Sequence, residues 1–153
     1  MILPCKLGCL LIQLDAEHHL LRYQWRVGAS LRHFRPALDE VAALMLEHKI
    51  ERVVADLNGL PDLPPDVQAW LSTTWLERAS APHARCLAVV AAGASNYNLM
   101  VVEGLLHQGR AWVNYDVQFF TDTGTALEWC LNSASQAVVL EAEWQRARPD
   151  GLT

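Results

Sequence analysis

Two short apolar stretches decide the fold: Arg-Val-Val-Ala-Asp-Leu at residues 52–57 and Cys-Leu-Ala-Val-Val-Ala at residues 86–91. Each is nearly continuous in apolar side chains, which is typical of a strand buried on both faces of a sheet. A proline-rich loop and a helical pattern lie between them. Because strands alternate with helices, the two are expected to be neighbours in a sheet with parallel pairing.

Upstream, two more strands are expected to form an antiparallel hairpin. Residues 7–15 are apolar as far as Asp15, and residues 20–27 alternate between apolar and polar side chains, as half-buried strands do. The next segment is expected to be an amphipathic helix that Ser30 caps. Its apolar residues recur at spacings of three and four: Leu31, Phe34, Leu38, Val41 and Met45.

Downstream, one helix is predicted to begin at about Pro65. A second helix is predicted over residues 95–108, with Ser95 as its N-terminal cap. A strand over residues 115–120 and a helix that begins after Asp122 are expected to follow. The order is β-β-α-β-α-β-α-β-α plus a C-terminal helix. The sequence thus predicts an α/β fold, a mixed sheet of about five strands with helices packed against it. Residues 1–133 are expected to form the domain, and 134–153 a helical extension.

Composition excludes several classes of protein. The chain has 153 residues, of which 52% are hydrophobic and 19% charged, with a formal net charge of -5. This is one globular domain by length, not a disordered chain or a coiled coil. The negative charge disfavours nucleic acid as a partner. No apolar run approaches the roughly 20 residues of a membrane helix, so no membrane insertion and a cytoplasmic location are expected.

Few residues suggest chemistry. Four cysteines, Cys5, Cys9, Cys86 and Cys130, are expected to be reduced thiols that act as small hydrophobic residues. Cys5 and Cys9 are expected on one strand face, too far apart to bridge easily. No phosphate-binding loop or zinc-protease motif occurs, and neither Gly-Ala-Ser stretch continues as a nucleophile elbow. The sequence predicts no metal site, no cofactor and no catalytic residue, so an enzyme is not expected.

Polar residues at the end of the 52–57 strand have two interpretations. Asp56, Asn58 and Asp66 are expected near the carboxyl ends of the strands, where ligands bind in open α/β sheets. The favoured alternative is that Asp and Asn cap the loop by bonding to its own backbone.

Trp70 and Trp75 offer a further hypothesis. Five residues apart on an α-helix, they lie about 140° apart around its axis, so both cannot point straight into one core. One of them is expected to line a cleft or an interface, against the alternative that both fill the core.

Several segments spread over residues 7–132 resemble one family. They are Tyr23-x-Trp25, Val53-Val54-Ala55-Asp56-Leu57-Asn58, Asp66-x-Gln68-x-Trp70-Leu71 and Val117-x-Phe119-Phe120-x-Asp122. Together they are similar to the STAS-like, SpoIIAA-like proteins of bacteria, which are also described alongside CRAL-TRIO-type lipid-binding domains. In the anti-anti-sigma factors of that group, Asp-Leu-Ser-Gly precedes a helix that begins with a phosphorylatable serine. Here Asp56-Leu57-Asn58-Gly59 matches the first part, but the helix start has no hydroxyl and carries Asp66.

The resemblance implies a non-catalytic regulatory or interaction module. It would present the 58–80 loop and helix to a protein partner, with a second copy of the chain as one such partner. The binding residues would be Asn58, Gly59, Asp66, Trp70 and Trp75. The alternative function is a carrier that holds a small apolar ligand between the sheet and the Trp-bearing helices. Such a carrier is expected to contain a closed cavity of at least ~300 Å³.

Overall fold

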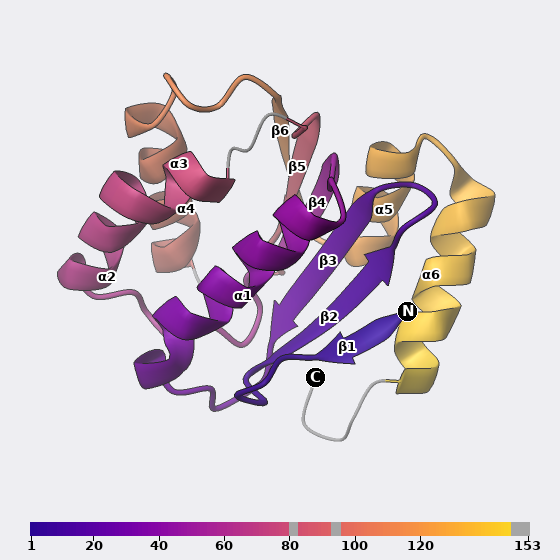
Figure 1. The fold of residues 1–153 in the computed structure, drawn as a ribbon, viewed down its shortest axis with the longest axis horizontal. Helices are drawn as coiled ribbons and strands as arrows, with labels where there is room; N and C mark the ends of the chain where they lie inside the picture. The colour runs from indigo at the N-terminus through magenta and orange to yellow at the C-terminus, as the bar shows by residue number, and fades with distance from the viewer. Residues whose placement is uncertain (80–82, 93–95, 148–153) are drawn as a thin grey trace.

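A six-stranded mixed sheet forms the centre of the molecule (Figure 1). The structure is a computed structural model and describes residues 1–79, 83–92 and 96–147. Strands lie in chain order, with β1–β2–β3 antiparallel and β3 to β6 parallel. The strands are β1 (Ile2–Pro4), β2 (Leu10–Asp15), β3 (Leu20–Trp25), β4 (Arg52–Asp56), β5 (Cys86–Val90) and β6 (Asp116–Phe120). The predicted α/β class with a mixed sheet is confirmed.

Helices cover both faces of this sheet (Figure 1). Because the parallel strands follow one another in chain order, right-handed crossovers place all their helices on the same face. These are α1 (Phe34–Glu47) after the 3-10 turn η1 (Leu31–His33), the continuous run α2 (Pro65–Trp70), η2 (Leu71–Trp75) and α3 (Leu76–Ala79), and α4 (Asn96–Gln108). The other face carries α5 (Thr123–Leu131) and α6 (Ala134–Ala147).

The central strands are apolar throughout because both of their faces are covered. On β4, Val53 and Ala55 belong to the core beneath α1 and η2, whereas Val54 belongs to the core with α5 and α6. Ser30 accepts a hydrogen bond from the Arg32 backbone N–H, as predicted for a cap. The other predicted cap, Ser95, lies outside the described residues.

The N-terminus differs from the prediction of one strand over residues 7–15. Ile2–Pro4 forms an additional edge strand, β1, and the chain turns back before β2 begins at Leu10. Gly8 permits the turn with a φ of +71°. Because Cys5 and Cys9 flank this turn, their Sγ atoms lie 3.5 Å apart, and the predicted separation along one strand face is wrong. Both thiols are free and buried.

Residues 134–147 of the predicted extension form α6, which packs on the sheet. Trp144 is 1% exposed, and the guanidinium carbon of Arg22 on β3 lies 3.8 Å from its ring centroid. Arg22 Nη1 also donates to Glu141, at 2.5 Å. Gln13 on β2 donates to the Leu140 carbonyl and to Glu143. Arg22 and Gln13 of this sheet face thus both hydrogen-bond to α6. The last six residues, 148–153, lie outside the described part.

Candidate functional site

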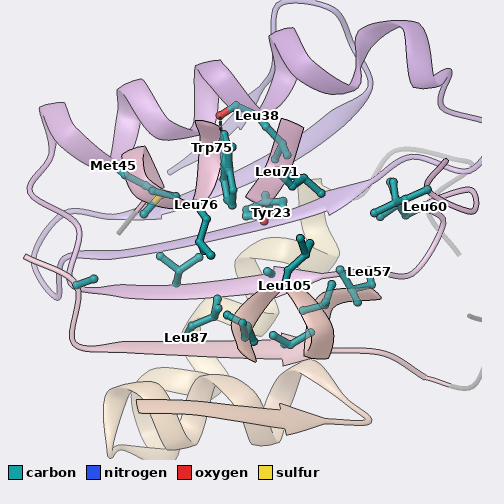
Figure 2. A pocket seen from close by; sticks show the side chains of 18 of the residues that line it. Tyr23, Leu38, Met45, Leu57, Leu60, Leu71, Trp75, Leu76, Leu87 and Leu105 are labelled. Atoms are coloured by element: carbon teal, nitrogen blue, oxygen red, sulfur yellow. Dashed lines mark hydrogen bonds between the residues drawn. The ribbon is translucent and has the colours of Figure 1, made fainter. Parts of the chain in front are cut away.

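An apolar cavity lies between the sheet and the helices of the crossover face (Figure 2). Its volume is about 110 Å³, and it is partly open to solvent. Strands β3 to β5 form its floor, and α1, η2, α3 and α4 form its walls. The labelled residues that line it are Tyr23, Leu38, Met45, Leu57, Leu60, Leu71, Trp75, Leu76, Leu87 and Leu105.

Two features of the sequence leave this space open. Ala55 on β4 and Ala79 on α3 both face the cavity, and their small side chains do not fill it. Helix α4 packs loosely, since its buried residue is Asn98 while Val102 and Leu105 are only half-buried. The cavity is smaller than the ~300 Å³ expected for a carrier. It approaches the engineered apolar cavity of about 150 Å³ that binds benzene, so its size suits a single ring.

A π-helical segment positions Trp75 over the cavity. In η2 the Leu76 N–H donates to the Leu71 carbonyl, an i to i+5 bond instead of the α-helical i to i+4 bond. Trp70 and Trp75 are both half-buried against the same core. Trp75 Nε1 donates to the Leu38 carbonyl of α1 at 3.1 Å, which fixes the indole ring (Figure 2).

The lining has almost no polar character. None of the described residues that form it carries a charged side chain. The indole N–H of Trp75 is bonded to Leu38, and the Cys86 thiol is hydrogen-bonded to Cys130, which lowers the pKa of Cys86. Tyr23 is 6% exposed, and burial raises the pKa of its phenol well above the usual value. Such a surface favours neutral, apolar ligands.

Asn58 and Gly59, which the sequence predicts as binding residues, stabilise the loop that follows β4. Asp56 Oδ1 accepts hydrogen bonds from the Asn58 N–H and Nδ2 at 2.9 and 2.8 Å, and Asn58 Oδ1 accepts from the Ala92 N–H. Burial raises the pKa of Asp56, against these hydrogen bonds from Asn58. Gly59 has a φ of +86°. This is the loop-capping arrangement predicted as the alternative to a ligand site.

Asp66 and Trp70 of α2 lie next to α1, Asp66 exposed and Trp70 half-buried. The Asp66 side chain is 72% exposed and contacts Arg35 of α1 at 3.5 Å. The Arg35 guanidinium carbon also lies 5.7 Å from the Trp70 ring centroid, and Trp70 packs edge-on against Phe34. Of the five predicted residues, Trp75 is therefore the one that lines the cavity.

A groove lies next to the cavity, between α2–η2 and α4. It has a volume of about 450 Å³. Tyr97 and Met100 of α4 line it and are 45% and 68% exposed. Tyr97 Oη donates a hydrogen bond to the Leu63 carbonyl oxygen. Gln68 Nε2 donates both to this carbonyl oxygen and to Tyr97 Oη. Asn98 of α4 stabilises the proline-rich loop between β4 and α2. Its Oδ1 accepts a hydrogen bond from the Leu63 N–H, and its Nδ2 donates to the carbonyls of Leu60 and Pro61.

Comparison with protein-family models, with curated proteins and with solved structures yields no match to this chain. Among the described residues, no helix has the length and hydropathy needed to cross a membrane. The same residues contain no cluster of three or more His, Cys, Asp or Glu side chains arranged to hold a metal ion.

Proposed function

We propose that this protein is a non-catalytic binding domain for a small apolar molecule, which it holds between the sheet and the Trp-bearing helices. The cavity beneath Trp75 carries this proposal. Its walls come from three separate crossover connections, and its lining is uncharged. These are the properties of a site that recognises a ligand by shape and apolar contact.

The apolar lining also supports a ligand. A ligand in the cavity would remove apolar surface of the lining, and its own, from water. Apolar surface removed from water contributes about 25 cal/mol per Å². An apolar ligand of matching shape is therefore expected to bind favourably.

Toluene is a suitable probe for this cavity because it is apolar and has a single ring. We expect it to raise the melting temperature and to shift the backbone amide resonances of Ala55, Leu71 and Leu105 in an NMR titration. Ala79→Leu, which fills the cavity, should abolish these shifts. Ala69→Leu adds the same side chain at an exposed position of α2 and should leave them unchanged. Absence of any shift in the wild-type protein would contradict the proposal.

Binding of a protein partner through the 58–80 surface is the second candidate function. The groove between α2–η2 and α4 favours it, because the exposed Tyr97 and Met100 adjoin that surface. A second copy of the chain is the partner that can be tested directly. Sedimentation equilibrium should show a concentration-dependent dimer that Met100→Glu disrupts and that Val138→Glu, at an exposed site on α6, preserves. A monomer at all concentrations would exclude this form of the proposal.

The STAS-like interpretation belongs to this second candidate. In it, Asp66 provides a permanent negative charge where related modules carry a phosphorylatable serine. The exposed position of the Asp66 carboxylate supports access by a partner. If Asp66→Ala leaves self-association unchanged, the charge has no role in that contact.

A further inference from the structure

The Tyr23 hydroxyl is a polar group of the cavity that forms no hydrogen bond with another described residue. The side chain extends from β3 into the space between Leu71 and Leu105 (Figure 2). Tyr23 is 6% exposed, and its hydroxyl forms no hydrogen bond with another described residue; it is not one of the fully buried polar atoms without a partner, so it remains accessible from the partly open cavity. An accessible hydroxyl that no protein group engages can hydrogen-bond to a molecule in the cavity.

The surroundings of Tyr23 explain why no protein group meets the hydroxyl. In the sheet, Tyr23 pairs with Ala55 of β4, whose side chain is apolar and short. Trp75 lines the same cavity, but its indole N–H bonds to the Leu38 carbonyl. Tyr115 is close enough to affect the Tyr23 phenol electrostatically and lines the same cavity. The Tyr23 hydroxyl is therefore available to a molecule in the cavity, which a phenylalanine of the same shape could not hydrogen-bond.

We propose that the ligand is a neutral molecule of about one ring that carries a hydroxyl or carbonyl oxygen, and that this oxygen hydrogen-bonds to Tyr23 Oη. This inference rests on the proposed ligand-binding function and specifies the class of ligand. The rest of the molecule contacts the apolar side chains that surround Tyr23, and the single hydrogen bond fixes its orientation.

The ligand is neutral because the cavity holds nothing that would compensate a charge. The described lining residues include no arginine, lysine, aspartate or glutamate, and a buried unpaired charge is strongly unfavourable. Burial raises the pKa of Tyr23, so the phenol stays protonated at neutral pH. It can both donate to a carbonyl and accept from a hydroxyl. Carboxylates such as benzoate are therefore excluded.

Phenol and toluene form a matched pair of probes, since they have nearly the same shape and differ by a hydroxyl in place of a methyl. Dissociation constants would be measured by NMR titration for the wild type, Tyr23→Phe and Tyr97→Phe. We expect the affinity for phenol relative to toluene to fall about tenfold in Tyr23→Phe, as for loss of one hydrogen bond. Tyr97→Phe removes a hydroxyl outside the cavity and should keep the wild-type ratio. Benzoate should not bind.

Two outcomes would overturn the inference: an unchanged affinity ratio in Tyr23→Phe, or benzoate binding as tightly as phenol. Both are distinct from failure of the proposed function, in which toluene itself does not bind the wild type. A second measurement needs no variant. In wild-type protein labelled with ¹³C at tyrosine Cζ, phenol should shift the Tyr23 resonance and toluene should move it much less. Equal shifts from the two probes would also contradict the inference.

Discussion

At Gly59 the chain turns with a φ of +86°, and a Cβ added there would lie 2.8 Å from the carbonyl oxygen of Trp25. Both the backbone conformation and this contact exclude a side chain. We expect Gly59→Ala to lower the free energy of unfolding by about 1–3 kcal/mol in urea titrations. Gly104→Ala is the control, because no atom lies within 4 Å of the added methyl on α4. It should be neutral or stabilising by up to about 1 kcal/mol, and similar losses in both variants would contradict a specific requirement at Gly59.

Replacing Tyr23 is expected to leave the free energy of unfolding unchanged or to raise it, in contrast to Gly59→Ala. Because its hydroxyl forms no hydrogen bond with another described residue, Tyr23→Phe removes no hydrogen bond within the protein and leaves the packing intact. We expect the free energy of unfolding without ligand to be unchanged or to rise by up to about 1 kcal/mol, measured by urea denaturation. A loss of more than about 1 kcal/mol would show that the hydroxyl is satisfied in the free protein.

The sequence identifies the residue types of the loop after β4 but not the role of Tyr23. Asn58 and Gly59 are typical of turns, and the capping alternative predicted from them agrees with their hydrogen bonds and backbone angle. The alternation of residues 20–27 places Tyr23 on one strand face. Its unpartnered hydroxyl depends on Ala55 opposite it and on Trp75 bonding elsewhere, contacts that arise only when distant segments pack.

At the scale of single elements, prediction fails where hydrogen-bond pattern or turn geometry overrides periodicity. The helix from Pro65 is predicted with uniform α-helical spacing, whereas Leu71–Trp75 is π-helical. β1 contains three residues, too few to show an alternating pattern. Long apolar runs such as β4 and β5 are predicted correctly because burial on both faces leaves a strong signal.

The start of α5 provides a prediction with a defined pH dependence. Asp122 is its N-cap, and the hydrogen bond from the Thr125 N–H holds the pKa of this exposed carboxyl below its usual value of 3.8. Since the folded-state pKa is the lower one, the charged cap stabilises the protein above about pH 3.8, and this contribution is lost as the pH falls through the folded-state pKa. We expect Asp122→Ala to cost about 1 kcal/mol at neutral pH.

Asp122→Asn is the matched control for this cap. Asparagine caps helices nearly as well but does not titrate, so most of the stability at neutral pH should remain. The free energies of unfolding of the wild type and Asp122→Asn should converge between about pH 5 and pH 2, measured by denaturant titration. A constant difference over that range would show that the carboxylate charge contributes nothing.

At the scale of the whole molecule, α6 is expected to unfold together with the sheet. Trp144 is 1% exposed, stacks on Arg22 and, with Leu11, forms a core cluster of its own. Removing a large buried aromatic side chain costs about 3–5 kcal/mol. We therefore expect Trp144→Ala to reduce the free energy of unfolding by that amount, whereas Val138→Ala, at a 67% exposed position of the same helix, should change it by less than about 0.5 kcal/mol.

The cooperativity of the transition distinguishes an integral α6 from an appended one. If α6 belongs to the same folding unit, circular dichroism at 222 nm and the fluorescence of the remaining tryptophans should report one coincident transition in both variants. An appended helix would instead melt first, and the dichroism would change before the fluorescence. The buried pairing of Arg22 with Glu141 favours the single transition, because separating α6 from the sheet would leave the guanidinium without this carboxylate in the core.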